Sequence, residues 1–162
     1  MQIWNLSQSF TRPNNTTAYA SGQLVANSAT AGLVVPMAFT VGGNSMPGQF
    51  RLSRIRLFKS GTSSTNAQFR LHLYASSPSV ANGDGGAWST SGAASYLGSI
   101  DVPGMKAFTD GCADVGDDAA GSEHWIRLAG GATYYGLLEA RAAYTPAANE
   151  QFTVTPETVE EW

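Results

Sequence analysis

The segment NAQFRLHLYA (residues 66–75) decides the fold class, because apolar and polar residues alternate along it with a period of two. Phe69, Leu71 and Leu73 fall on one side of this segment, and the residues between them fall on the other. Such alternation is typical of a β-strand that has one buried face. The segment therefore predicts a protein built from strands, and the rest of the chain can be interpreted outward from it.

Similar strand-like segments recur in both directions, separated by Gly, Pro, Ser and Asn. We expect strands over residues 6–12, 18–27, 34–41, 49–59, 66–75, 95–102, 105–109, 123–129, 133–143 and 151–159. Long connections at 76–92 and 110–122 favour crossings between two sheets. The sequence thus predicts an all-β fold, a jelly-roll-like antiparallel β-sandwich forming a single domain over residues 1–162. Pro156 predicts that the last strand lies at a sheet edge, because proline has no N–H to donate.

The segment 49–59 changes phase along its length. Phe50 and Leu52 fall in one phase of the alternation, whereas Ile55 and Leu57 fall in the other. One inserted residue would bring all four onto the same face, so we expect a β-bulge near Ser53.

The composition narrows the possible functions. Charged residues make up 13% of the chain, against about 25% in ordinary soluble domains, and the net charge is −3. A surface so poor in charge suits a protein that packs against other copies or another protein, although small all-β domains are often rich in Ser, Thr and Gly. The charge balance argues against direct nucleic-acid binding. No apolar run is long enough for a membrane helix, so we expect no membrane contact.

An acidic segment at 110–118 is the strongest candidate for a metal site. Asp110, Asp114, Asp117 and Asp118 could offer oxygen ligands to Ca²⁺. Their spacing does not match an EF-hand, and a solvated acidic loop explains the segment better. We therefore expect no cofactor.

Catalytic chemistry has little support in the sequence. His72 and His124 are the two histidines, too few for a patterned zinc site. Cys112 lies between acidic residues that would keep its thiol protonated, so we expect it to be an inert loop residue. These patterns predict that the protein is not an enzyme. A glycan-cleaving enzyme, the least favoured alternative, would need two close carboxylates in a cleft.

The two ends of the chain are candidate partner-binding segments. Residues 1–9 carry Ile3, Trp4 and Leu6 and are apolar enough to form an N-terminal arm. Trp162 ends an acidic segment that could contact a neighbouring molecule.

Further partner-binding candidates lie inside the chain. Alternation places Arg54 and Arg56 on one face of a strand, where they could meet an acidic partner or form ordinary ion pairs within the sheet. Trp88 lies in a Gly/Ser-rich segment and is the best candidate for stacking on a sugar, although a packing role is commoner for tryptophan.

Four stretches resemble a family of small structural proteins from tailed-phage and prophage virions. They are FTRPNNTTAYASGQLVANS (10–28), IRLFKSG (55–61), NAQFRLHLY (66–74) and YGLLEARAAYTP (135–146). The resemblance implies a head decoration (cement) protein, a trimeric β-sandwich that binds the major capsid protein on the outer capsid surface and bridges capsomers. It also implies assembly in the cytoplasm of a bacterial host, and it brings no catalytic motif. The alternative is a receptor- or carbohydrate-binding module of a tail or head fibre.

Overall fold

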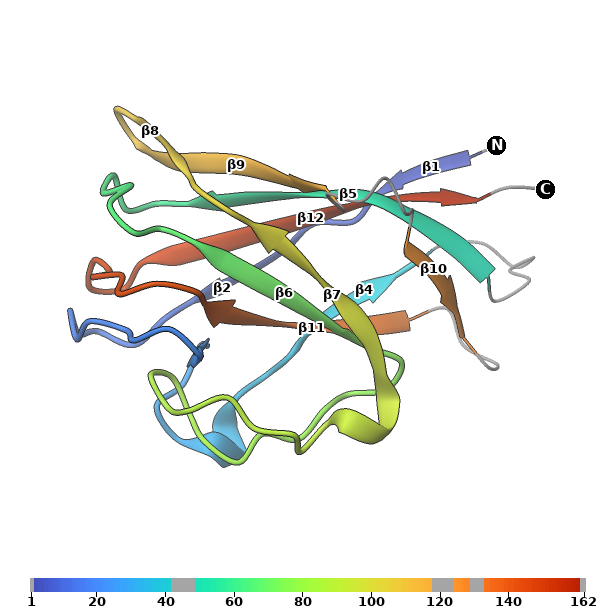
Figure 1. Ribbon diagram of the computed structural model, residues 1–162, viewed down its shortest axis with the longest axis horizontal. Coiled ribbons are helices and arrows are strands. Elements are labelled where there is room, and N and C mark those ends of the chain that lie inside the picture. The colour runs from blue at the N-terminus through green and yellow to red at the C-terminus, as the bar shows by residue number, and fades with distance from the viewer. Residues whose placement is uncertain (1, 42–48, 118–123, 129–132, 161–162) are drawn as a thin grey trace.

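The computed structural model describes residues 2–41, 49–117, 124–128 and 133–160 (Figure 1). In these residues two antiparallel sheets pack face to face, which confirms the predicted all-β sandwich. None of the described residues forms a helix of the length and apolar character that crossing a membrane requires.

The larger sheet has seven strands in the order β1-β12-β5-β9-β8, with β2 also paired to β12 and β10 also paired to β5. Its strands are β1 (Gln2–Asn5), β2 (Gln8–Thr11), β5 (Gln49–Lys59), β8 (Lys106–Phe108), β9 (Gly111–Asp117), β10 (His124–Arg127) and β12 (Gln151–Glu160). The smaller sheet has five strands in the order β3-β11-β6-β7, with β4 also paired to β11. Its strands are β3 (Gln23–Val25), β4 (Met37–Thr40), β6 (Phe69–Tyr74), β7 (Tyr96–Val102) and β11 (Thr133–Ala140). Two 3₁₀ turns, η1 (Ala31–Leu33) and η2 (Ala93–Ser95), lie in the connections.

The strand pairs nest inside one another along the chain. β2 pairs with β12, β3 with β11, β5 with β9, and β6 with β7. Folding this nested ladder over into two sheets gives the jelly-roll arrangement, as predicted. Along one side of the sandwich β7 and β9 approach so closely that a Cβ on Gly116 would lie 2.5 Å from the carbonyl oxygen of Asp101. Only glycine fits this position.

The predicted bulge in β5 is confirmed. Glu157 of β12 pairs with Arg54, but the next residue, Thr158, pairs with Leu52, so Ser53 is the extra residue. Because Ser53 restores the phase, Phe50, Leu52, Ile55 and Leu57 all face the space between the sheets.

The prediction that Pro156 marks an edge strand is wrong, because β12 lies between β5 and the strands β1 and β2. The carbonyl oxygen of Pro156 accepts a hydrogen bond from the N–H of Leu6, 3.2 Å away. The N and O atoms of one residue in a strand point to the same side, so the proline nitrogen faces the break between β1 and β2. No strand residue at that break needs a hydrogen bond from the nitrogen of residue 156, so proline fits there.

The described part of the candidate arm, residues 2–9, belongs to the larger sheet instead of extending away from it. Its strands β1 and β2 both pair with β12. Trp4 and Leu6 are half-buried against the core, while Ile3 points outward and is exposed. Trimming this segment would therefore remove an edge of the sandwich.

The acidic segment 110–118 also differs from the expected loop, because residues 111–117 form strand β9. Cys112 is fully buried in the core, so its thiol is shielded from solvent. The sequence does not reveal this strand, because its small residues and acids give no clear alternation of apolar and polar positions.

A buried ion pair stabilises one end of the sandwich. Lys59, in the inward phase of β5, lies 3.1 Å from Glu150, and both side chains are fully buried. The Lys59 ammonium also donates to two backbone carbonyls, and the Tyr144 hydroxyl donates to Glu150. Each charged group is thus paired and hydrogen-bonded, as burial requires.

Candidate functional site

The two outer faces of the sandwich differ in how far the chain covers them. We call the outer face of the smaller sheet, which carries His72, Tyr74 and Leu137, the covered face, because residues 75–95 fold over it. We call the outer face of the larger sheet the bare face. The side chains of Arg54 and Phe58 lie on it.

Apolar packing holds the covering segment in place. Leu24, Ala26, Tyr74 and Leu137 are buried there, and they pack against Val34, Val80, Trp88 and Tyr135. The same burial raises the pKa of Tyr74 to about 12. This cluster is separate from the core between the sheets, so the covered face has a small core of its own.

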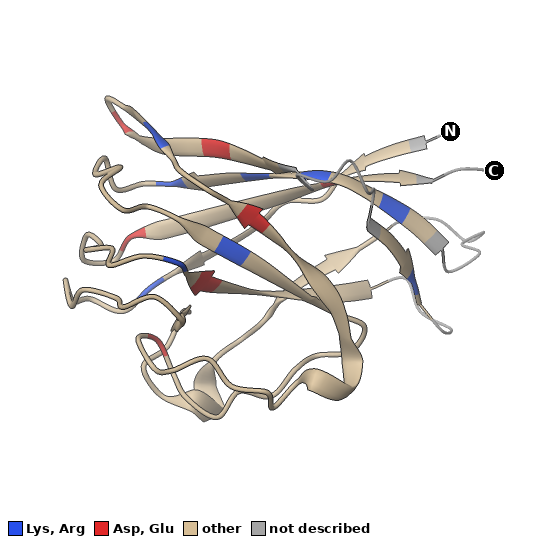
Figure 2. Ribbon diagram, viewed as in Figure 1, with Lys and Arg blue, Asp and Glu red and all other residues tan. Residues whose placement is uncertain are grey.

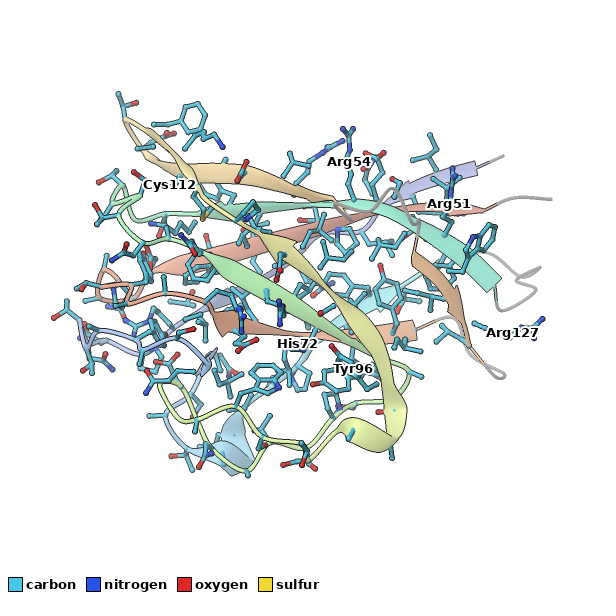
Figure 3. All side chains as sticks on the ribbon, viewed as in Figure 1. Arg51, Arg54, His72, Tyr96, Cys112 and Arg127 are labelled. Carbon is cyan, nitrogen blue, oxygen red and sulfur yellow. The ribbon has the colours of Figure 1, made fainter. Side chains whose placement is uncertain are left out.

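His72 links the smaller sheet to the covering segment (Figure 3). Its Nε2 lies 2.7 Å from Glu139, its Nδ1 lies 3.1 Å from the hydroxyl of Tyr96, and its ring stacks on Trp88 at 4.1 Å between centroids. Arg141 donates to the other oxygen of Glu139. Burial lowers the pKa of His72, even though Glu139 favours the charged form. In the neutral ring Nε2–H donates to Glu139 and Tyr96 donates to Nδ1, so both nitrogens are satisfied.

This geometry changes the interpretation of Trp88. The residue was the best sugar-stacking candidate, but one face of its ring packs on His72 and the side chain is half-buried in the cluster. Trp88 therefore holds the cover in place.

A second, buried network fixes the covering segment to the N-terminal part of the chain. Asp84 accepts hydrogen bonds from Arg12, from the hydroxyl of Tyr19 and from the backbone N–H of Ala26. The Arg12 and Asp84 side chains are only 1% and 4% exposed. Burial, reinforced by Asp84, raises the pKa of Tyr19 far above its usual range, so its phenol stays protonated.

The bare face, in contrast, contains an open apolar hollow of about 480 Å³. It is lined by Arg56, Leu57, Phe58, Phe108, Ala113, Asp114, Val115, Thr153 and Thr155. Phe58, Phe108 and Val115 are 38%, 57% and 44% exposed, which is unusual for large apolar side chains that lie together. The ring of Phe58 lies against Gly111, where a Cβ would be only 2.9 Å from it.

The charges beside the hollow are paired within the sheet. Arg54 and Arg56 lie on the same face, as predicted, and both contact Glu157 of β12, at 3.0 and 2.8 Å. Burial by itself would raise the pKa of Glu157. The hydrogen bonds and the positive charge of these arginines have the larger effect, so the pKa lies below its ordinary value. Charged residues are sparse elsewhere along the ribbon (Figure 2), and Figure 3 shows Arg54 projecting away from the sandwich.

The proposed Ca²⁺ ligands do not come together in the described part of the chain. No group of three or more His, Cys, Asp or Glu side chains that could hold a metal ion occurs there. Asp110 lies in the turn before β9, and Asp114 lies 3.4 Å from Lys106. Asp117 ends β9 with its side chain outside the described set, and Asp118 and Trp162 lie outside the described residues.

Known protein families and curated proteins were compared with the chain, and none of them matches it.

Phe58, Phe108 and Val115 are surface residues that the sequence patterns do not single out. A signal for Phe58 was present, since the bulge at Ser53 places it in the same outward phase as Arg54 and Arg56. The other two lie on strands too short or too rich in acids to show a clear alternation.

Proposed function

We propose that this chain is a decoration protein of a phage-type capsid, and that the bare face is the surface by which it attaches to the shell. The observation that carries the proposal is the exposed apolar hollow walled by Phe58, Phe108 and Val115. A soluble domain gains nothing from leaving such a surface in water, whereas a protein that docks on a larger assembly buries it.

The chemistry of the bare face is typical of a protein interface. Interface cores are enriched in aromatic residues and arginine and depleted in lysine and acids. The bare face combines Phe58 and Phe108 with Arg54 and Arg56, whose long side chains can exchange partners across an interface. Double-sheet jelly rolls also recur in viral capsid proteins, which adds support by analogy alone.

In this proposal the major capsid protein is the partner, and the decoration protein binds the outer capsid surface and bridges neighbouring capsomers as a homotrimer. Assembly takes place in the bacterial cytoplasm, and no catalytic step is involved. The low charged fraction of 13% fits a protein that works in contact with others.

Binding to capsids that lack the protein tests the proposal. Phe58→Ser should lower capsid occupancy at least tenfold, because it removes a wall of the hollow without opening the core. The matched control is Leu33→Ser, since Leu33 is 65% exposed on η1, beyond the smaller sheet (Figure 1). Equal occupancy by both variants would rule out the bare face as the contact.

Cryo-electron microscopy of the wild-type complex would supply the second readout. Regular density at symmetry-related sites is the expected result. No capsid binding, together with binding in a glycan screen, would favour the fibre-module alternative.

A further inference from the structure

Strand β8 leaves one edge of the larger sheet open. It pairs with β9 on one side, and no described strand pairs with its other side. Lys106, Ala107 and Phe108 are all exposed, including Ala107 on the inward phase, so the β8–β9 hairpin projects past the sandwich (Figure 1). An open strand edge presents backbone N–H and C=O groups that can pair with another strand.

The side chains of β8 are complementary to themselves. Lys106 and Phe108 share one face of the strand, and Ala107 lies on the other. If two β8 strands pair antiparallel about a two-fold axis at Ala107, Lys106 of each copy lies directly opposite Phe108 of the other. A lysine stem and ammonium group can cover an aromatic ring in that position.

We propose that a second copy of this chain binds here, with two β8 strands pairing antiparallel about a two-fold axis at Ala107. The two larger sheets then become one continuous sheet, and the two hollows lie next to each other on one side of it. Lys106 can exchange its present contacts, because its side chain is 71% exposed and its ammonium reaches Asp114 and the carbonyl oxygen of Gly104 only at 3.4 and 3.2 Å. A strand of only three residues gives a weak contact, so we expect association at high protein concentration or on a surface that holds copies close together.

This contact shares Phe108 with the proposed capsid surface but uses the edge of β8, and it can be tested in solution without capsids. A three-fold contact elsewhere on the molecule would be compatible with it, because the β8 contact would then join neighbouring trimers.

Disulfide trapping tests the geometry. Directly opposite residues of an antiparallel pair have Cα atoms about 4.5–5.5 Å apart, within the range for a disulfide. Ala107→Cys should therefore give a covalent dimer when oxidised glutathione accepts the two electrons. Asp110→Cys, in the exposed turn of the same hairpin, is the control. The native Cys112 is buried and should not contribute. Cross-linking no faster at position 107 than at 110 would overturn the proposal.

A charge exchange tests the register by sedimentation. Phe108→Lys places lysine opposite lysine and should abolish the weak dimer. Adding Lys106→Glu to this variant places glutamate opposite lysine and should restore it. Both positions are exposed, so the fold should survive, which thermal unfolding can verify. A monomeric wild-type protein at millimolar concentration, or a dimer that the single variant leaves unchanged, would also overturn the proposal.

Discussion

The covered face and the bare face both carry large apolar side chains, but the chain shields those side chains from water on the covered face only. Each is the outer surface of a sheet that carries large apolar side chains. On the covered face the chain buries them itself, so Tyr74 and Leu137 are only 4% and 5% exposed. On the bare face Phe58 and Phe108 remain 38% and 57% exposed. The contrast indicates that this fold can cover the outer face of a sheet with its own chain, so the cluster of Phe58, Phe108 and Val115 that stays exposed on the bare face marks where we expect a partner.

The largest expected effect concerns the attachment of the cover. Asp84→Ala should lower the free energy of unfolding by about 3–5 kcal/mol, because it leaves the buried guanidinium of Arg12 without its carboxylate. It also removes the acceptor for Tyr19 and for the N–H of Ala26. Urea unfolding measures the change.

Asp84→Asn is the matched variant for this position. It keeps an acceptor oxygen but removes the charge, so its loss should be smaller than that of the alanine variant. A loss below about 1 kcal/mol for Asp84→Ala would mean that water reaches Arg12 and that the cover is not fixed by this network.

Sequence alone could predict features that depend on neighbouring residues. The alternation in residues 66–75 placed Phe69, Leu71 and Leu73 in the core and His72 on the opposite face, as the structure shows. The change of phase within β5 predicted the bulge at Ser53 in the same way. Both are local effects of the two-residue repeat of a strand.

Features that depend on distant residues could not be predicted. Nothing near Arg12 indicates that it is buried, because its partner Asp84 lies 72 positions away. The edge assignment of Pro156 failed for a similar reason, since the break that accommodates it belongs to the N-terminal strands. The hollow, likewise, forms only when β5, β8, β9 and β12 lie side by side.

A smaller effect should appear as a pH dependence of the covered face. The pKa of His72 in the folded protein lies below its ordinary value of about 6.5, chiefly because the ring is buried. The unfolded chain therefore takes up a proton that the folded chain resists, and stability should fall as pH drops below about 6.5. Urea unfolding at pH values above and below this point measures the effect.

His72→Gln isolates this contribution, because it removes the titrating ring while keeping a polar side chain. The difference in stability between the two pH values should shrink in the variant. Asp101 and Glu157 also have lowered pKa values, but as carboxylates they lose their contribution only in more acidic solution. An unchanged pH dependence in His72→Gln would show that His72 does not couple the cover to pH.

The smallest effect should come from an ion-pair variant on the bare face. Glu157→Gln removes the carboxylate that Arg54 and Arg56 share, but these arginine side chains are 45% and 48% exposed and stay hydrated. We expect a loss of about 0–1 kcal/mol in the free energy of unfolding, and less at high salt, because exposed charges are screened. Urea unfolding at low and high ionic strength measures both. Glu157→Gln and Asp84→Asn both replace a carboxylate by an amide, one on the bare face and one in the network that fixes the cover. Their losses in the free energy of unfolding can therefore be compared directly. A loss for Glu157→Gln as large as that for Asp84→Asn would mean that the ion pairs of the bare face stabilise the fold. That result would argue against the bare face as a partner-binding surface.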